Sequence, residues 1–134
     1  MSLGILIVDD SDFMRKRVRS ALDQGTYRIV GEAENGARAV QTYKEHSDAI
    51  DVVLMDIVMR KANGLKATAA IKQLDPDAKV VMCTSVGQRK KIDLAARAGA
   101  DAYIMKPFDN EDLFEALQGV AGDDQPQGTD DLAA

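Results

Sequence analysis

Residues 5–10 of the chain read ILIVDD, an apolar run that stops at two acidic residues, Asp9 and Asp10. A run of four residues rich in Ile and Val is short enough to be a buried strand of a parallel sheet. Three later runs have the same form, and each stops at a reactive or charged side chain: residues 52–55 before Asp56, 80–83 before Thr84, and 102–105 before Lys106. Ligands of open parallel sheets bind beyond the carboxyl ends of the strands, so we expect these side chains to share one site.

Between these runs the apolar residues follow a helical period. Spacings of three and four residues recur over residues 14–22, 67–74, 92–99 and 113–120, as in helices that pack one face on a sheet. A fifth strand over residues 27–33 and a weaker helix over about residues 37–46 complete the alternation. Five strands alternating with five helices predict an α/β fold, a doubly wound five-stranded parallel sheet in three layers, (βα)5.

Several residues mark the ends of these elements. Asp109 is a suitable cap for the last helix, and Gly99 is suited to end the fourth helix. The Asn63-Gly64 pair predicts a loop after Asp56. The bond between Lys106 and Pro107 is a candidate cis peptide, which would direct the lysine side chain back into the site.

Length and charge limit the class of protein. A chain of 134 residues with 46% apolar residues is long enough for one domain with one core. The net charge is −5, but the acids of residues 123–131 carry four of these charges, so residues 1–122 are nearly neutral. We therefore expect a domain over residues 1–121 that binds no nucleic acid directly. Residues 122–134 are expected to be an acidic disordered tail or a linker.

Two further features bear on location. Cys83, the one cysteine, falls within an apolar run and is most simply a small buried hydrophobe. No segment approaches the roughly 18 apolar residues of a membrane helix, and the first residues lack the pattern of a signal peptide. We expect a cytoplasmic protein without membrane insertion.

The predicted site has a definite chemistry. Three carboxylates brought close together repel one another unless a hard cation lies among them, and Mg²⁺ prefers such oxygen ligands. Asp56, at the end of the third run, is then the candidate nucleophile, because a carboxylate accepts a phosphoryl group as an acyl phosphate. Lys106 would supply a positive charge, and the Thr84 hydroxyl a hydrogen bond, to the phosphoryl oxygens.

Taken together, these motifs resemble the receiver domain of two-component response regulators. The resemblance spans about residues 4–121 and is closest to the stand-alone chemotaxis type, with a CheY-like, flavodoxin-like fold. It is carried by the following stretches: the Asp9-Asp10 pair and the segment DSDFMR at 10–15, DIVM at 56–59 with Asn63-Gly64, Thr84-Ser85, GAD at 99–101, and YIMKPF at 103–108.

The resemblance implies roles for individual residues. Asp56 would be phosphorylated by a histidine kinase. Asp10, Asp56 and the backbone carbonyl of Val58 would hold Mg²⁺, with Mn²⁺ as a possible substitute, and Asp9 would assist through water. The domain would therefore be a phospho-acceptor in signalling rather than an enzyme.

The resemblance also implies a switch. Thr84 and Tyr103 would move together on phosphorylation and reshape the surface of the fourth helix, fifth strand and fifth helix, where a downstream protein target binds. The protein would be a monomer or a phosphorylation-dependent dimer. Tyr103 also has a simpler interpretation, as an aromatic residue that only packs on an edge strand.

Two positions depart from the family pattern. Arg60 stands where the family generally has Pro, so the loop after Asp56 lacks a fixed φ angle. Ser85 stands where the family generally has Ala or Gly, and it is small enough to admit a phosphoryl group. Neither change removes a chemical role.

Three alternative classes share features with this sequence. A phosphatase of the haloacid dehalogenase type also uses a strand-terminal Asp and Mg²⁺, but it needs a second acid where this chain has Val58. A flavodoxin-like cofactor carrier needs a phosphate-binding loop where residues 9–12, DDSD, would repel phosphate. A third alternative is a receiver domain from a larger regulator, with the acidic segment as the linker to an output domain.

Basic residues gather near the start of the first predicted helix. Two interpretations are open: a solvated helix face, or a patch that steers an acidic kinase surface toward the site. The residues are Arg15, Lys16, Arg17 and Arg19.

Overall fold

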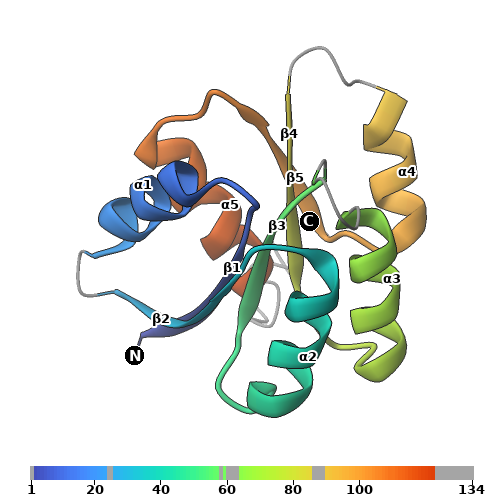
Figure 1. Ribbon diagram of the computed structural model, residues 1–134. Helices are drawn as coiled ribbons and strands as arrows, with labels where there is room; N and C mark the ends of the chain where they lie inside the picture. The colour runs from blue at the N-terminus through green and yellow to red at the C-terminus, as the bar shows by residue number, and fades with distance from the viewer. Residues whose placement is uncertain (1, 24–25, 58, 60–63, 86–89, 123–134) are drawn as a thin grey trace, which may run out of the picture.

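The computed structural model describes residues 2–23, 26–57, 59, 64–85 and 90–122, with only the backbone of residues 84, 90 and 91. Five strands and five helices alternate along this part of the chain (Figure 1). In chain order they are β1 (Leu3–Val8), α1 (Asp12–Leu22), β2 (Tyr27–Ala33), α2 (Gly36–His46), β3 (Val52–Asp56), α3 (Gly64–Leu74), β4 (Val80–Ser85), α4 (Lys90–Ala98), β5 (Ala102–Lys106) and α5 (Asn110–Gly122).

The strands form one parallel sheet in the order β2-β1-β3-β4-β5. Helices α1 and α5 cover one face of this sheet, and α2, α3 and α4 cover the other (Figure 1). The side chains of a strand alternate between its two faces, so Ile5 and Ile7 pack with α1 and α5 while Leu6 and Val8 pack toward α2 and α3. This arrangement confirms the predicted doubly wound α/β fold in three layers.

The central strand β3 is buried along its whole length. Its neighbours are aligned with it, because Val8 pairs with Met55 and Asp56 pairs with Cys83. In the adjacent strand pair, β4–β5, Ser85 pairs with Lys106. The register therefore brings the carboxyl ends of β1, β3 and β5 to one edge of the sheet, as the sequence predicts.

The ends of the elements follow the predicted signals. The Asp112 N–H donates to Asp109 Oδ1 at 2.8 Å, so Asp109 caps α5. Gly99, with φ of 106°, ends α4. The Lys106–Pro107 peptide bond is cis, as expected.

Three further features concern the sheet register, the end of the described chain and the length of the helices. The β1–β2 register shifts between Ile5 and Leu6, where Val30 has no partner on β1. Gly122 is the last residue of α5, and the rest of the expected tail, residues 123–134, lies outside the described residues. Among the described helices, none is long and apolar enough to cross a membrane.

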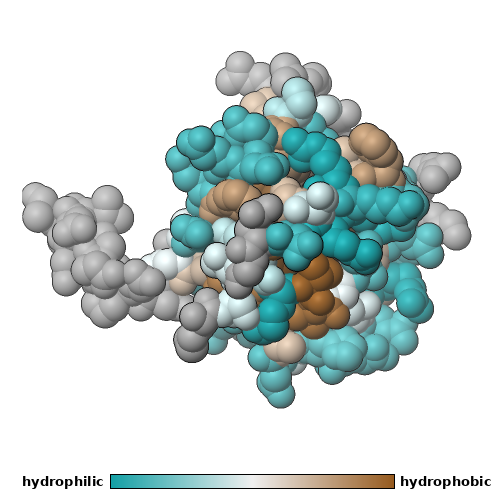
Figure 2. All heavy atoms as spheres, turned by 90° about the vertical axis from the view of Figure 1, so that its left-hand side faces the viewer, coloured by the Kyte–Doolittle hydropathy of each residue, from teal (hydrophilic) through white to brown (hydrophobic). Residues whose placement is uncertain are grey.

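The face that carries α1 is largely hydrophilic, with hydrophobic residues gathered near its centre (Figure 2). Much of the hydrophilic character of α1 comes from charged residues that form ion pairs with Asp12 and Glu32: Arg15, Lys16 and Arg19.

Tyr43 ties α2 to the segment after α3. Its side chain is buried, and its hydroxyl donates to Asp75 Oδ2 at 2.7 Å. Burial raises the pKa of Tyr43, and the hydrogen bond and negative charge of Asp75 raise the pKa further. The folded state therefore favours the neutral phenol.

We expect Tyr43→Phe to lower the free energy of unfolding by about 1 kcal/mol at neutral pH, because it removes this hydrogen bond. The stabilisation from the neutral phenol is fully present below the unfolded pKa of about 10 and is lost as pH rises toward the higher folded pKa. The stability difference between wild type and variant, measured by urea denaturation, should therefore be constant up to about pH 9 and shrink as the pH passes about 10. A difference that stays constant up to about pH 11 would contradict the assignment.

Candidate functional site

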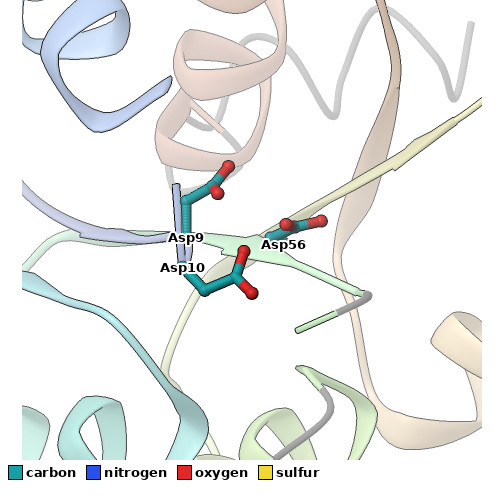
Figure 3. Close-up of side chains that lie close together, drawn as sticks. All are labelled: Asp9, Asp10 and Asp56. Atoms are coloured by element: carbon teal, nitrogen blue, oxygen red, sulfur yellow. The ribbon is translucent and has the colours of Figure 1, made fainter. Parts of the chain in front are cut away.

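Three carboxylates meet at the carboxyl edge of the sheet. Asp9 and Asp10 directly follow β1, and Asp56 is the last residue of β3 (Figure 3). One carboxylate oxygen from each residue lies within 4.8 Å of the others. Asp9 and Asp56 are each 7% exposed, and Asp10 is partly buried. Water therefore screens little of the repulsion among these charges.

Lys106, at the end of β5, faces two of these acids. Its Nζ lies 3.2 Å from Asp9 Oδ2 and 3.5 Å from Asp56 Oδ2. Burial alone would lower the pKa of Lys106, but the charges of Asp56 and Asp9 outweigh burial and raise that pKa. Lys106 is therefore a cation at neutral pH and offsets part of the negative charge of the site.

Asp9 is held by the backbone around it. The Ser11 N–H donates to Asp9 Oδ1 at 2.9 Å, and the Asp9 N–H donates to the Ala33 carbonyl at 3.1 Å. The Asp9 carbonyl accepts from Arg15 Nη1 at 2.6 Å. Sequence reasoning missed this last contact, because it treated Arg15 only as part of a basic helix face.

The chain passes very close to Asp56 where α3 begins. The Gly64 N–H donates to the Ile57 carbonyl at 2.9 Å. A Cβ atom at Gly64 would lie 2.1 Å from the Asp56 carbonyl oxygen, so a glycine is required for this approach. The sequence predicts a loop at Asn63-Gly64, whereas Gly64 is the first residue of the helix and Asn63 lies outside the described residues.

Cys83 lies beside the site as a neutral group. It pairs with Asp56 across the β3–β4 ladder and is buried, as predicted. Burial raises the pKa of the Cys83 thiol, and the charges of Asp56 and Asp9 add to this effect against the opposing charge of Lys106. The thiol therefore adds no negative charge to the acidic cluster.

The structure describes some of the remaining predicted site residues only in part or not at all. The backbone of Thr84 lies in β4 and pairs with Met105, one position before the pair that includes Lys106. The Thr84 side chain and the whole of Val58 and Arg60 lie outside the described part of the chain. Tyr103 lies on β5, three residues before Lys106, and is 49% exposed.

The basic residues at the start of α1 have partners on the protein itself. Arg15 and Arg19 both pair with Glu32, and Lys16 pairs with Asp12. Arg17 donates to the Phe108 carbonyl at 2.8 Å, and its guanidinium lies 5.4 Å from the centre of the Phe108 ring. These contacts favour a structural role over a freely available docking patch. Lys16 and Arg19 are the exposed members of this group.

The donor set fits a divalent cation. Hard cations such as Mg²⁺ bind carboxylate oxygens, and such a cation would relieve the repulsion among Asp9, Asp10 and Asp56. Lys106 Nζ lies next to the same acids and is suited to contact an anion bound there. The site can thus accommodate a metal ion and an anionic group side by side.

Comparison with known proteins agrees with this geometry. The sequence matches the model of the response regulator receiver domain over residues 5–118. It is 46% identical over 120 residues to the chemotaxis protein CheY of Halobacterium salinarum, covering 90% of this chain and 98% of that protein. It is 44% identical over 117 residues to CheY of Bacillus subtilis, covering 87% and 96%.

A solved structure gives the same result. The CheX–CheY–BeF₃–Mg²⁺ complex from Borrelia burgdorferi contains a chain that is 31% identical, with a TM-score of 0.83 and 88% of each chain covered. The phosphatase and flavodoxin-like alternatives have no support from these matches. With its acidic pocket at the strand ends, the protein is a phospho-acceptor in signalling rather than a catalytic enzyme, and the chain belongs to the response regulator receiver domain family.

Proposed function

We propose that this chain is a chemotaxis-type response regulator in which Asp56 accepts a phosphoryl group from a histidine kinase with the help of Mg²⁺. One observation carries the proposal: three carboxylate oxygens lie within 4.8 Å of one another, and Lys106 Nζ lies beside two of those carboxylates. That arrangement provides ligands for a cation and a positive group for the phosphoryl oxygens in the same place.

Asp56 is the acceptor among the three acids. It lies on the central strand, between neighbouring strands that carry the Asp9-Asp10 pair and Thr84. Its carboxylate oxygen attacks phosphorus, the bond to the kinase histidine breaks, and an acyl phosphate forms. Lys106 and the Thr84 hydroxyl stabilise the charge on the phosphoryl oxygens.

The acids and one backbone group would hold the metal. Asp10, Asp56 and the Val58 carbonyl are the proposed direct ligands of Mg²⁺ or Mn²⁺, and Asp9 contributes through water. When bound, the ion neutralises negative charge on the carboxylates and the incoming phosphoryl group. Asp9 is kept in place for this role by its hydrogen bond from the Ser11 N–H.

The output surface is the face formed by α4, β5 and α5. Phosphorylation at Asp56 would draw Thr84 toward the site and let Tyr103 change position. Tyr103 is 49% exposed and borders an apolar groove of about 370 Å³ that is also lined by Ile92, Ala95 and Ala96. Such a groove suits a protein target, and the Borrelia CheY was solved together with CheX.

We expect Asp56→Asn to reduce phosphorylation by acetyl phosphate and Mg²⁺ more than about 100-fold, because an amide is a poor nucleophile. Mass spectrometry of the intact protein measures the phosphorylated fraction, and circular dichroism checks the fold. The exposed acid Asp48, replaced by Asn, serves as the control for loss of one negative charge and should label normally. Undiminished label on Asp56→Asn would rule out Asp56 as the acceptor.

We expect Asp10→Ala to weaken Mg²⁺ binding more than about tenfold and yet to stabilise the metal-free protein by about 0.5–1 kcal/mol. The opposite signs arise because Asp10 is both a proposed ligand and a source of repulsion. Calorimetric titration gives the affinity, and urea denaturation in EDTA gives the stability. Lower stability in EDTA would show that the acids are less crowded than their positions indicate.

We expect Lys106→Ala to lower metal-free stability by roughly 1–3 kcal/mol, because it leaves Asp9 and Asp56 without their cation. Added Mg²⁺ should restore part of this loss, since the metal takes over the positive charge. Denaturation midpoints with and without Mg²⁺ measure both effects. Equal losses with and without the metal would contradict the electrostatic explanation.

A further inference from the structure

Arg15 of α1 lies against the backbone of the acidic cluster, and none of the proposed roles uses it. Its Nη1 donates to the Asp9 carbonyl at 2.6 Å, and its Nε donates to Glu32 Oε1 at 3.2 Å. Its Nη2 donates to Asp12 Oδ1, also at 3.2 Å. The Arg15 side chain is only 15% exposed. One guanidinium thus joins the first helix, the second strand and the end of the first strand.

The Asp9 carbonyl belongs to the peptide that links Asp9 to Asp10. A peptide unit is planar, so restraining the carbonyl oxygen also restrains the nitrogen and the Cα atom of Asp10, from which its side chain leaves the backbone. The other side of Asp9 is fixed as well, by the bonds to Ala33 and Ser11. The hydrogen bond from Arg15 to the Asp9 carbonyl is therefore a third restraint on the segment that carries Asp9 and Asp10.

Glu32 holds Arg15 in this position. Glu32 lies on β2, pairs across the ladder with Ile7 of β1, and has a side chain only 20% exposed. It also pairs with Arg19, one turn further along α1. An ion pair with little exposure is weakly screened by salt, and the planar guanidinium fork can reach several acceptors at once, which an ammonium group cannot do with the same geometry.

We propose that Arg15, held by Glu32, is a positioning residue that sets the Asp9–Asp10 peptide and so raises the affinity of the acidic cluster for a divalent cation. This inference rests on the proposed function, because it assumes that the cluster binds Mg²⁺. The sign of the change in Mg²⁺ affinity separates this positioning role from simple electrostatics. The positive charge of Arg15 alone opposes cation binding, so removing it should tighten binding unless its positioning role dominates.

The test is a calorimetric titration of the full chain with Mg²⁺, without a phosphodonor. We expect Arg15→Gln and Arg15→Lys each to weaken binding about tenfold, because the first loses the fork and the charge and the second loses only the fork. Glu32→Gln should also weaken binding, but it removes a negative charge, so the Arg15 variants are the ones that separate positioning from simple electrostatics. Arg15→Gln combined with Glu32→Gln should be no worse than Arg15→Gln alone, since the two residues act as one unit.

Lys16→Gln is the matched control. It removes the same charge from the next position of α1, where the side chain is 73% exposed and pairs only with Asp12 among the ion pairs of the described residues. We expect its Mg²⁺ affinity to stay within about twofold of wild type. Circular dichroism and urea denaturation in EDTA establish that each variant is folded, and Arg15→Lys, which keeps the charge, tests the same restraint if Arg15→Gln does not fold.

A second readout separates positioning from general damage. At saturating Mg²⁺ the Arg15 variants should recover phosphorylation by acetyl phosphate to within about threefold of wild type, because only the metal requirement has changed. Unchanged or tighter Mg²⁺ binding by both Arg15 variants, with normal binding by wild type, would overturn this inference alone. Absence of Mg²⁺ binding by wild type would overturn the proposed function and this inference with it.

Discussion

Repulsion among Asp9, Asp10 and Asp56 is the constraint on which the rest of the site depends. Two of these acids are nearly buried, and all three carboxylates lie close together. Crowded buried charge is costly unless cations offset it. Lys106 supplies one positive charge from β5, and the remaining negative charge suits a divalent ion. The same crowding that is costly without a metal thus makes the cluster a fitting site for a divalent cation.

The sheet makes this crowding possible without disturbing the core. Because the strands are parallel and in register, their apolar residues are buried between two layers of helices while their last residues meet at one edge. Local contacts then refine the site: Gly64 lets α3 begin against the Asp56 carbonyl, and Ser11 and Arg15 hold Asp9. The core provides a rigid support, and these few contacts orient the acids.

The fold and the acids of the site could be predicted from sequence because both depend on local patterns. Each apolar run ends at a predicted site residue, and parallel strands bring such ends together whatever the loops do. The contacts of Arg15 and Gly64 could not be predicted in this way. The Arg15–Glu32 pair depends on how α1 lies against β2. The position of Glu32 on β2 follows a shift in the β1–β2 register between Ile5 and Leu6, and this shift leaves no pattern in the sequence. The close approach at Gly64 depends on the path of the chain after Asp56, where an Asn-Gly pair also fits an ordinary turn. The roles of the site residues in phosphoryl transfer, including those of Val58, Thr84 and Tyr103, stay predictions.

The central claim is that Asp56 is phosphorylated in a reaction that depends on a divalent cation bound by its neighbours. Chemical mapping tests this most directly: the protein is treated with acetyl phosphate, reduced with borohydride, which converts an aspartyl phosphate to homoserine, and digested for peptide sequencing by mass spectrometry. We expect homoserine at position 56 when Mg²⁺ is present and none when EDTA replaces it. Homoserine at another aspartate, or equal conversion at position 56 in EDTA, would contradict the account.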